Sequence, residues 1–333
     1  MQLHRVPKVE LHRHLEGSLR IDTLRQIATE KGLSLPEPGL PALVQVQPGE
    51  EMNFTNFLSK FKTLRLFFDS PEIISRLARE AVEDAAADGV VYLELRFTPL
   101  ALARTQGFAL ADVMDWVAHA ARDAAQKAGI GLRLIASCNR HEPVQAAEEV
   151  AALALDRTAL GFAGLDLAGN EAEFPAAPFI GVMRAAKEAG LRITVHAGEW
   201  GGPSNIRQAI EVFGAERIGH GVRVLSDPYT TDLARERGTV FEVCPTSNYQ
   251  SGVVHSLGEH PLPDMIRSGL KVAIGTDDPS ISGITLTDEY RLAVESLGLT
   301  EPELLHSIRT AAEAAFLTEP EKTALYARLD LPH

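Results

Sequence analysis

The sequence is poor in cysteine, has no long hydrophobic run and carries no excess of basic residues. Its two cysteines, Cys138 and Cys244, lie far apart and form no CxxC pair, so we expect a reducing, cytoplasmic environment rather than a disulfide framework. No stretch reaches the roughly 18 apolar residues that a membrane-spanning helix needs, and the N-terminal residues lack the apolar core of a signal peptide. The formal net charge of −13 argues against binding to nucleic acid or to an anionic membrane, because both require basic patches.

Several common catalytic signatures are also absent. The chain has no GxSxG nucleophile elbow, no P-loop and no GxGxxG dinucleotide fingerprint. Zinc deaminases of the HxE and PCxxC type do not match, because no second cysteine follows Cys244 and Pro245 at the required spacing. No low-complexity tail or linker interrupts residues 1–333, of which 45% are hydrophobic, so we expect a single domain with a large core.

The hydrophobic pattern predicts eight strands alternating with helices. Most of the strand-like runs are continuously apolar, as expected for parallel strands buried on both faces. Helical segments rich in Ala, Glu and Arg separate most of them, and several end at a glycine, which is typical of a helix C-cap. Eight such repeats predict the α/β class and a (β/α)8 TIM barrel. The expected strands cover 8–14, 90–98, 131–138, 163–169, 192–197, 217–220, 239–244 and 271–276, and the expected helices cover 72–88, 109–128, 144–155, 178–189, 204–213, 228–237 and 260–268.

Residues 20–70 interrupt this repeat after the first strand. They contain a predicted helix at 20–32, a Pro- and Gly-rich stretch at 35–51 and an apolar helix at 53–68. An insertion at this point lies at the C-terminal mouth of the barrel, where lids are usually built, so we expect a helical lid. Residues 302–330 are expected to form closing helices.

Residues with ligand or acid–base chemistry stand at the ends of several expected strands. The segments are VELHRHLEG, ITVHAGE, RIGHGV and VAIGTDDP, each an apolar run followed by ligand-type residues and a turn. The carboxyl ends of parallel barrel strands meet at one mouth, so these side chains should converge there. Nitrogen and oxygen donors without a thiolate suit Zn²⁺ with a coordination position left for water. The residues are His12, His14, His196, Glu199, His220, Asp277 and Asp278.

The metal ligands expected from this pattern are His12, His14, His196 and Asp277. His12 and His14 are two residues apart on one strand, so both point to the same face. Two buried imidazoles are costly unless a metal or hydrogen bonds engage them. A polar strand end would explain this pair alone, but the other two residues, on different strands, favour a metal. The fourth strand, GLDLAGNE, carries no Lys that could bridge two metals, so we expect one ion per chain.

Further residues have predicted roles around the metal. Glu199 lies in the turn HAGE, where a closed apolar pocket would raise its pKa and make it a general acid; an acidic residue at a helix N-terminus is the alternative. His220 is expected to orient a metal-bound water, although a lone histidine is commonly a hydrogen-bonded core residue. Asp277 and Asp278 diverge at a strand end, so one can bind metal while the other faces substrate. Gly169 could offer its backbone N–H to a ligand.

The motifs VELHRHLEGS, LDLAGNE, TVHAGE, RIGHGV, FEVCPTSN and TDDP, in this order and spacing, resemble those of the adenosine deaminase family over nearly the whole chain. The resemblance implies a zinc-dependent hydrolase of purine metabolism that converts adenosine and 2′-deoxyadenosine to inosine or its deoxy form and ammonia. FTNFLSKF also resembles that family's lid helix, which implies that Leu58 and Phe61 cover the pocket; core packing of the insertion helix is the alternative.

The resemblance also implies a role for each reacting group. His220 and Asp277 would orient and deprotonate the zinc-bound water, and the resulting hydroxide would attack C6 of the purine. Glu199 would protonate N1 and so break the aromaticity of the ring. Asp278 would hydrogen-bond the N7 side of the base, and the Gly169 N–H would meet N3.

Two positions depart from the family pattern. Glu16 stands where Asp is usual, near the expected ribose 5′-hydroxyl, so sugar recognition could change or a longer 5′ substituent could fit; with His14 it is expected to line the substrate site. Asn170 stands where the family motif AGDE has its Asp. Deaminases of adenine, modified adenosines, 6-methylated AMP and 6-amino-6-deoxyfutalosine share the metal motif, while CPTSN followed by YQSG favours the nucleoside enzymes. A phosphate ligand is not expected without a basic cluster, although Arg140 and His141 follow the third strand.

Two other classes of function stay open. A metal-dependent hydrolase of another substrate, such as a cyclic amide, is disfavoured by the missing strand-four Lys and by the presence of Glu199. A non-catalytic binding protein would tolerate the loss of Glu199, His220 or Asp277, yet all three are present. The expected partner is a small purine nucleoside, and the sequence leaves the oligomeric state open.

Overall fold

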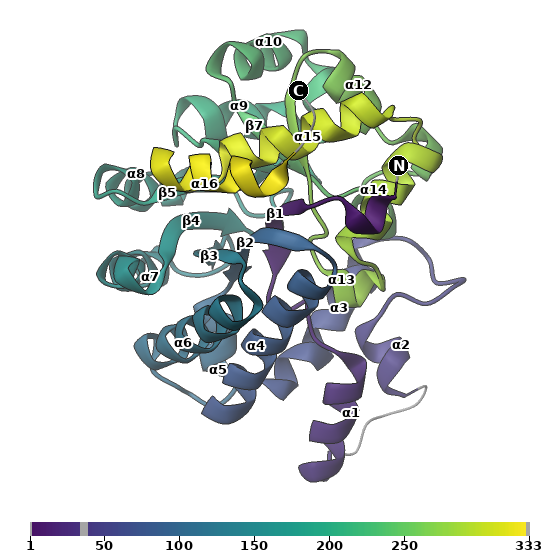
Figure 1. Ribbon diagram of the computed structural model, residues 1–333. Helices are drawn as coiled ribbons and strands as arrows, with labels where there is room; N and C mark the ends of the chain where they lie inside the picture. Colours follow the sequence, from purple (N-terminus) through teal and green to yellow (C-terminus); the bar gives the residue numbers. More distant parts are fainter. Residues whose placement is uncertain (1, 34–38, 331–333) are drawn as a thin grey trace.

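Eight parallel strands form a nearly closed barrel in the computed structural model, which describes residues 2–33 and 39–330 (Figure 1). Neighbouring strands pair in parallel in the order β1 to β8, so the predicted (β/α)8 TIM barrel is confirmed. Every strand begins and ends within two residues of its expected bounds. The strands are β1 (Lys8–His14), β2 (Val90–Phe97), β3 (Gly131–Asn139), β4 (Phe162–Ala168), β5 (Arg192–Ala197), β6 (Arg217–His220), β7 (Val240–Val243) and β8 (Lys271–Ile274).

The seam between β8 and β1 runs through Asp277, which follows β8. Asp277 forms an isolated parallel bridge with Arg13 of β1. The backbone N–H of His14 donates to Asp277 O at 2.8 Å, and the N–H of Asp277 donates to His12 O at 2.9 Å. Backbone hydrogen bonds therefore fix Asp277 between the two histidines of β1.

Charged side chains occupy part of the barrel interior. Arg96 on β2 donates to Glu242 Oε2 on β7 at 2.7 Å. Because β2 and β7 are not neighbouring strands, this contact crosses the inside of the barrel. Arg217 on β6 pairs with Glu94 of β2 and, at 2.5 Å, with Glu242 Oε1. All four side chains are fully buried, so each charge depends on its partners for stabilisation.

The helices between the strands lie within two residues of the predicted segments at each end. Gly129 and Gly238, with φ of 68° and 64°, end two of them in the left-handed conformation that the C-cap pattern predicted. These helices are α4 (Pro71–Ala87), α6 (Leu110–Ala128), α7 (Val144–Asp156), α8 (Ile180–Glu188), α9 (Pro203–Glu211), α10 (Pro228–Arg237) and α12 (Leu262–Arg267).

Four described α-helices outside the insertion were not predicted. α5 (Pro99–Arg104), α11 (Pro245–Gln250) and α13 (Pro279–Ser282) have at most six residues and begin at a proline just after a strand, so they are too short to show helical periodicity. α14 (Leu286–Glu295) begins at a capping box formed by Thr285 and Asp288, a signal that was present in the sequence. Short 3₁₀ helices are η1 (Leu3–Arg5), η2 (Arg65–Phe67), η3 (Thr158–Leu160), η4 (Ala177–Phe179), η5 (Val224–Ser226) and η6 (Leu257–Glu259).

The closing helices predicted at 302–330 are α15 (Glu301–Ala314) and α16 (Glu319–Leu329). α15 packs against both β1 and β8, and α16 packs against β2 (yellow in Figure 1). The C-terminal helices therefore cover the outside of the barrel at its seam.

The insertion between β1 and α4 contains α1 (Ile21–Glu30), α2 (Leu40–Val44) and α3 (Phe54–Leu64), which lie to one side of the barrel in Figure 1. Lys60 ties this region together, because its Nζ donates to Ala42 O at 2.7 Å and to Glu50 Oε1 at 2.6 Å. The short helix α2 falls in the predicted Pro- and Gly-rich stretch, of which residues 35–38 lie outside the described residues. That the insertion acts as a lid stays a prediction.

None of the helices in the described part of the chain is both long and apolar enough to cross a membrane. Cys138 and Cys244 are buried and form no disulfide. The single domain expected for 1–333 stays a prediction.

The barrel network supplies a stability test. We expect Arg217→Met to lower the free energy of unfolding by about 3–5 kcal/mol, because it removes the ion-pair partner of buried Glu94 and one of the two arginines that pair with buried Glu242. Chemical denaturation measures this change. Arg25→Met is the control, since Arg25 pairs with Asp22 on the exposed surface of α1 and should leave the midpoint unchanged. Equal midpoints for both variants would contradict the importance of the network.

Candidate metal centre and active-site pocket

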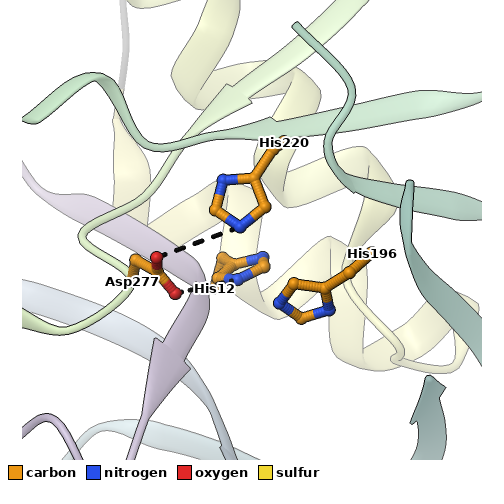
Figure 2. Close-up of side chains that lie close together, drawn as sticks. All are labelled: His12, His196, His220 and Asp277. Atoms are coloured by element: carbon orange, nitrogen blue, oxygen red, sulfur yellow. Dashed lines mark ion pairs between the residues drawn. The ribbon is translucent and has the colours of Figure 1, made fainter. Parts of the chain in front are cut away.

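Four buried side chains at the mouth of the barrel place their ligand atoms within 4.8 Å of one another. They are His12 of β1, His196 of β5, His220 of β6 and Asp277 after β8, and Figure 2 shows them facing a common centre. The Nε2 atom of His12 is buried and has no hydrogen-bond partner. Three imidazoles, one carboxylate and an orphaned nitrogen are a donor set that fits a divalent metal such as Zn²⁺.

His14 lies beside this cluster. Its Nε2 is 3.3 Å from Asp277 Oδ1, almost as close as the 3.2 Å from His12 Nε2 to the same oxygen. Burial lowers the pKa values of His14 and His220 well below the usual range, so both imidazoles are neutral. The structure thus brings all four predicted ligands together and adds His220 as a further neighbour.

Carboxylates set the tautomers of His12 and His196. His12 Nδ1 is 2.7 Å from Glu242 Oε2, and His196 Nδ1 is 3.0 Å from Asp166 Oδ1. Arg96 and Arg217 hold the pKa of Glu242 well below its usual range although burial opposes this, so Glu242 is an ionised acceptor. Each histidine therefore carries its proton on Nδ1 and keeps the Nε2 lone pair for a metal.

His220 has the opposite tautomer. The backbone N–H of Leu262 donates to His260 Nδ1 at 3.1 Å, which leaves the proton of neutral His260 on Nε2. Burial lowers the pKa of His260 to about 4, so this histidine is neutral. His260 Nε2 donates to Asn248 Oδ1 at 3.2 Å, and Asn248 Nδ2 donates to His220 Nδ1 at 3.0 Å. The proton of His220 must therefore sit on Nε2.

This proton makes His220 a hydrogen-bond donor inside the cluster. Its Nε2 lies 3.8 Å from Glu199 Oε1 and 3.9 Å from Asp277 Oδ2. An N–H cannot also donate a lone pair to a metal. The hydrogen-bond network thus favours the predicted ligand set of His12, His14, His196 and Asp277 over one that includes His220.

Backbone strain aims two of these side chains. His220 and Asp277 both have φ of 61°, a left-handed conformation that residues other than glycine rarely adopt. Such strain commonly persists at functional sites, where the surrounding structure holds it in place. Asp277 is held by the seam hydrogen bonds with β1, and His220 is held through Asn248.

Glu171 fixes the turn that carries Glu199. Its two carboxylate oxygens accept from the backbone N–H groups of Gly198 at 3.0 Å and Glu199 at 2.6 Å. Burial, followed by the charges of Asp277, Glu171 and Asp278, raises the pKa of Glu199 well above its ordinary value. Glu199 can therefore hold a proton and donate it. Sequence reasoning missed the role of Glu171, although this residue ends the motif LDLAGNE.

A cavity of about 210 Å³ opens above the cluster. Glu16 lies in its wall, where Oε1 accepts from the Thr98 N–H at 2.8 Å and Oε2 is buried without a partner. Burial and then the Asp277 charge raise the pKa of Asp278 well above its usual range, and Asp278 Oδ1 also lacks a partner. All the predicted substrate-site residues line this cavity, namely His14, Glu16, Leu58, Phe61, Gly169 and Asp278, together with Glu199, His220 and Asp277.

Other residues in the cavity wall were only partly anticipated. His141 lines the cavity, whereas Arg140 donates to His196 O at 2.5 Å and supports the metal centre. Asn170 lines it too, while its Oδ1 accepts from two backbone N–H groups of its own loop. Arg65 and Trp200 also lie in the wall, and sequence reasoning gave Arg65 no role.

The barrel with a buried cluster of imidazoles and a carboxylate at its strand ends, which could hold a metal, is the arrangement of the amidohydrolase superfamily. The family model described as adenosine deaminase matches residues 7–332. The chain is 39% identical over 325 residues to the adenosine deaminase of Serratia proteamaculans, covering 96% of this chain and 97% of that protein. The chain therefore belongs to the adenosine deaminase family and is a hydrolase that acts on C–N bonds.

Solved structures with the same fold include enzymes with different substrates. The adenine deaminase of Arthrobacter aurescens has a TM-score of 0.89 at 29% identity, covering 97% of this chain and 98% of that one. The Arabidopsis N6-mAMP deaminase has a TM-score of 0.89 at 29% identity, with 98% of each chain covered. An amidohydrolase from Burkholderia ambifaria, solved with bound Zn, has a TM-score of 0.89 at 28% identity, covering 98% of this chain and 90% of that one.

The tautomer of His220 can be tested through Asn248. We expect Asn248→Asp to lower deaminase turnover by at least about 100-fold, because a carboxylate against Nδ1 moves the imidazole proton away from Nε2. Nitrogen-15 NMR of the histidine rings reports the exchange of tautomers directly. Asn56→Asp, on α3, makes the same chemical change elsewhere and serves as the control. An unchanged His220 spectrum in Asn248→Asp would refute the assignment.

Proposed function

We propose that this chain hydrolyses the 6-amino group of adenosine and 2′-deoxyadenosine, releasing ammonia and inosine or its deoxy counterpart, with one Zn²⁺ per chain. The observation that carries the proposal is the convergence of a buried carboxyl group, Glu199, with the histidine–carboxylate cluster on one cavity. The match to adenosine deaminases at 39% identity supports adenosine as the substrate. The chain also matches adenine and N6-mAMP deaminases at 29% identity, so the substituent carried by the purine base has to be determined by experiment.

His12, His14, His196 and Asp277 would hold the metal. The Nε2 lone pairs of His12 and His196, fixed by Glu242 and Asp166, support this assignment. A Zn²⁺ ion at these ligands supplies a nucleophile at neutral pH, because it lowers the pKa of water in its coordination sphere.

The remaining groups divide the proton transfers and the binding of the base. His220 donates from Nε2 and, together with Asp277, orients the attacking water. Glu199 gives its proton to N1 of the purine, which makes C6 more electrophilic. Asp278, whose Oδ1 has no partner in the protein, meets the N7 side of the base. The backbone N–H of Gly169, with φ of 95° and no side chain in the way, meets N3.

The insertion would shield the reaction from water. Leu58 and Phe61 of α3 line the cavity with apolar surface, which supports the proposed lid. Exclusion of water strengthens the electrostatic interactions inside a site of this kind. We also propose that residues 1–333 act as one catalytic domain on a small molecule in the cytoplasm, without nucleic acid.

The decisive experiment is the loss of absorbance of the adenine band on adding adenosine to zinc-loaded protein, with adenine and 2′-deoxyadenosine in parallel. Turnover of the two nucleosides and not of adenine is the expected result. Turnover of adenine alone would replace the nucleoside assignment, and no turnover of any 6-aminopurine would refute the proposal.

Glu199→Gln tests the proton donor. We expect the variant to bind zinc as the wild type does and to lose at least about 100-fold in kcat, because an amide cannot protonate N1. Metal analysis and steady-state kinetics measure the two quantities on the same preparation. Wild-type turnover in this variant would remove Glu199 from the reaction.

Asp277→Ala tests the shared ligand. Asp277 Oδ1 is within 3.3 Å of both His12 Nε2 and His14 Nε2, so its loss should reduce metal content and turnover together. Adding excess Zn²⁺ should restore the activity of chelator-treated wild type but not that of the variant. A zinc-replete, active variant would exclude Asp277 as a ligand.

A further inference from the structure

Among the described residues, Arg65 is the one arginine that lines the active-site cavity, and its guanidinium group has no acidic partner. It forms no ion pair with any residue in the described ranges, and its buried Nε has no hydrogen-bond partner. Its guanidinium carbon lies over the Phe61 ring, 5.7 Å from the centroid, at the junction of α3 and η2. A guanidinium with free donors, resting on an aromatic ring of the cavity wall, is placed to receive an acceptor from the cavity.

A purely structural role would be to balance nearby acids. The charge of Arg65 does act on the carboxyl groups of Glu16 and Asp278. Neither carboxyl group reaches it within 4.0 Å, however, and the unpartnered oxygens Oε2 of Glu16 and Oδ1 of Asp278 stay free. Charge balance therefore leaves the directional donors of Arg65 unused. Their fork geometry matches the oxygens of a carboxylate or a phosphate.

The position of Arg65 leaves room for a substituent. Arg65 lines the cavity and is itself only partly buried, so it lies where the cavity wall reaches the surface. A second basic side chain, His141, lines the cavity and packs against Phe174, which is 37% exposed. In a purine nucleoside the sugar is attached at N9, across the ring system from C6. With C6 at the metal centre, the sugar therefore lies on the side of the base that faces away from the metal.

We propose that Arg65 selects substrates whose sugar carries an anionic group at the 5′ position, either a carboxylate or a phosphate. This inference rests on the proposed deaminase function and adds a second recognition point to it. Glu16 Oε2 accepts from a sugar hydroxyl, while the Arg65 fork binds the anion beside it. Unmodified adenosine engages Glu16 through its sugar and leaves Arg65 without a ligand.

Product binding tests the proposal without turnover. Calorimetric titration compares inosine, inosine 5′-phosphate and inosine 5′-carboxylate on zinc-loaded wild type, Arg65→Met, Arg65→Lys and the surface control Arg25→Met. We expect at least one anionic product to bind wild type about tenfold more tightly than inosine, in line with a charge-assisted bidentate contact. Arg65→Met should abolish this ratio, Arg65→Lys should keep part of it, and Arg25→Met should leave it unchanged. The two anions distinguish a carboxylate site from a phosphate site.

The kcat/KM values of adenosine and its 5′-phosphate and 5′-carboxylate derivatives separate this inference from the proposed function. Deamination of adenosine with no advantage for either anion, or an equal loss for all substrates in Arg65→Met, would overturn the role of Arg65 alone. Failure to deaminate any of the three would overturn the proposed function and this inference with it.

Discussion

One buried carboxylate, that of Glu242 on β7, connects the inside of the barrel to the metal centre. Its Oε2 lies 2.7 Å from His12 Nδ1 and 2.7 Å from an Nη of Arg96, and its Oε1 lies 2.5 Å from Arg217. Two guanidinium groups compensate for the removal of this charge from water and keep it ionised. An ionised acceptor fixes the proton of His12 on Nδ1, so the Nε2 lone pair faces the mouth. The chemistry of the mouth thus depends on charges held inside the barrel.

Hydrogen bonds at Nδ1 give neighbouring histidines different roles, because their direction differs from one histidine to the next. Carboxylates face Nδ1 of His12 and His196, whereas an amide N–H from Asn248 faces Nδ1 of His220. The first two imidazoles become lone-pair donors, and the third becomes a proton donor. Rings whose centroids are only 4.7–5.2 Å apart can therefore share one centre and still divide metal binding from proton handling. The strained backbone at His220 and Asp277 is consistent with a site held in place by its surroundings.

The insertion after β1 contributes two kinds of surface to the cavity. Leu58 and Phe61 provide apolar wall, while Arg65, one turn further along, provides a positive charge opposite the acids of the barrel. Sequence motifs anticipated the apolar wall, because FTNFLSKF resembles the lid helix of the adenosine deaminase family. They did not anticipate Arg65, since a charged residue late in an amphipathic helix is ordinarily solvent-facing. Whether it faces water or the cavity depends on how the helix packs on the barrel.

The sequence by itself determined the strand order, the barrel and the residues at the strand ends, because parallel strands of an α/β repeat must bring their carboxyl ends to one mouth. His12, His14, His196 and Asp277 could be found in this way. Only the tertiary structure decided which nitrogen of each imidazole is free. That choice depends on contacts between residues far apart in the chain, such as the 230 positions that separate the partners His12 and Glu242. Local periodicity carries no information on such contacts, so the sequence supplied the chemical groups and the packing assigned their protons.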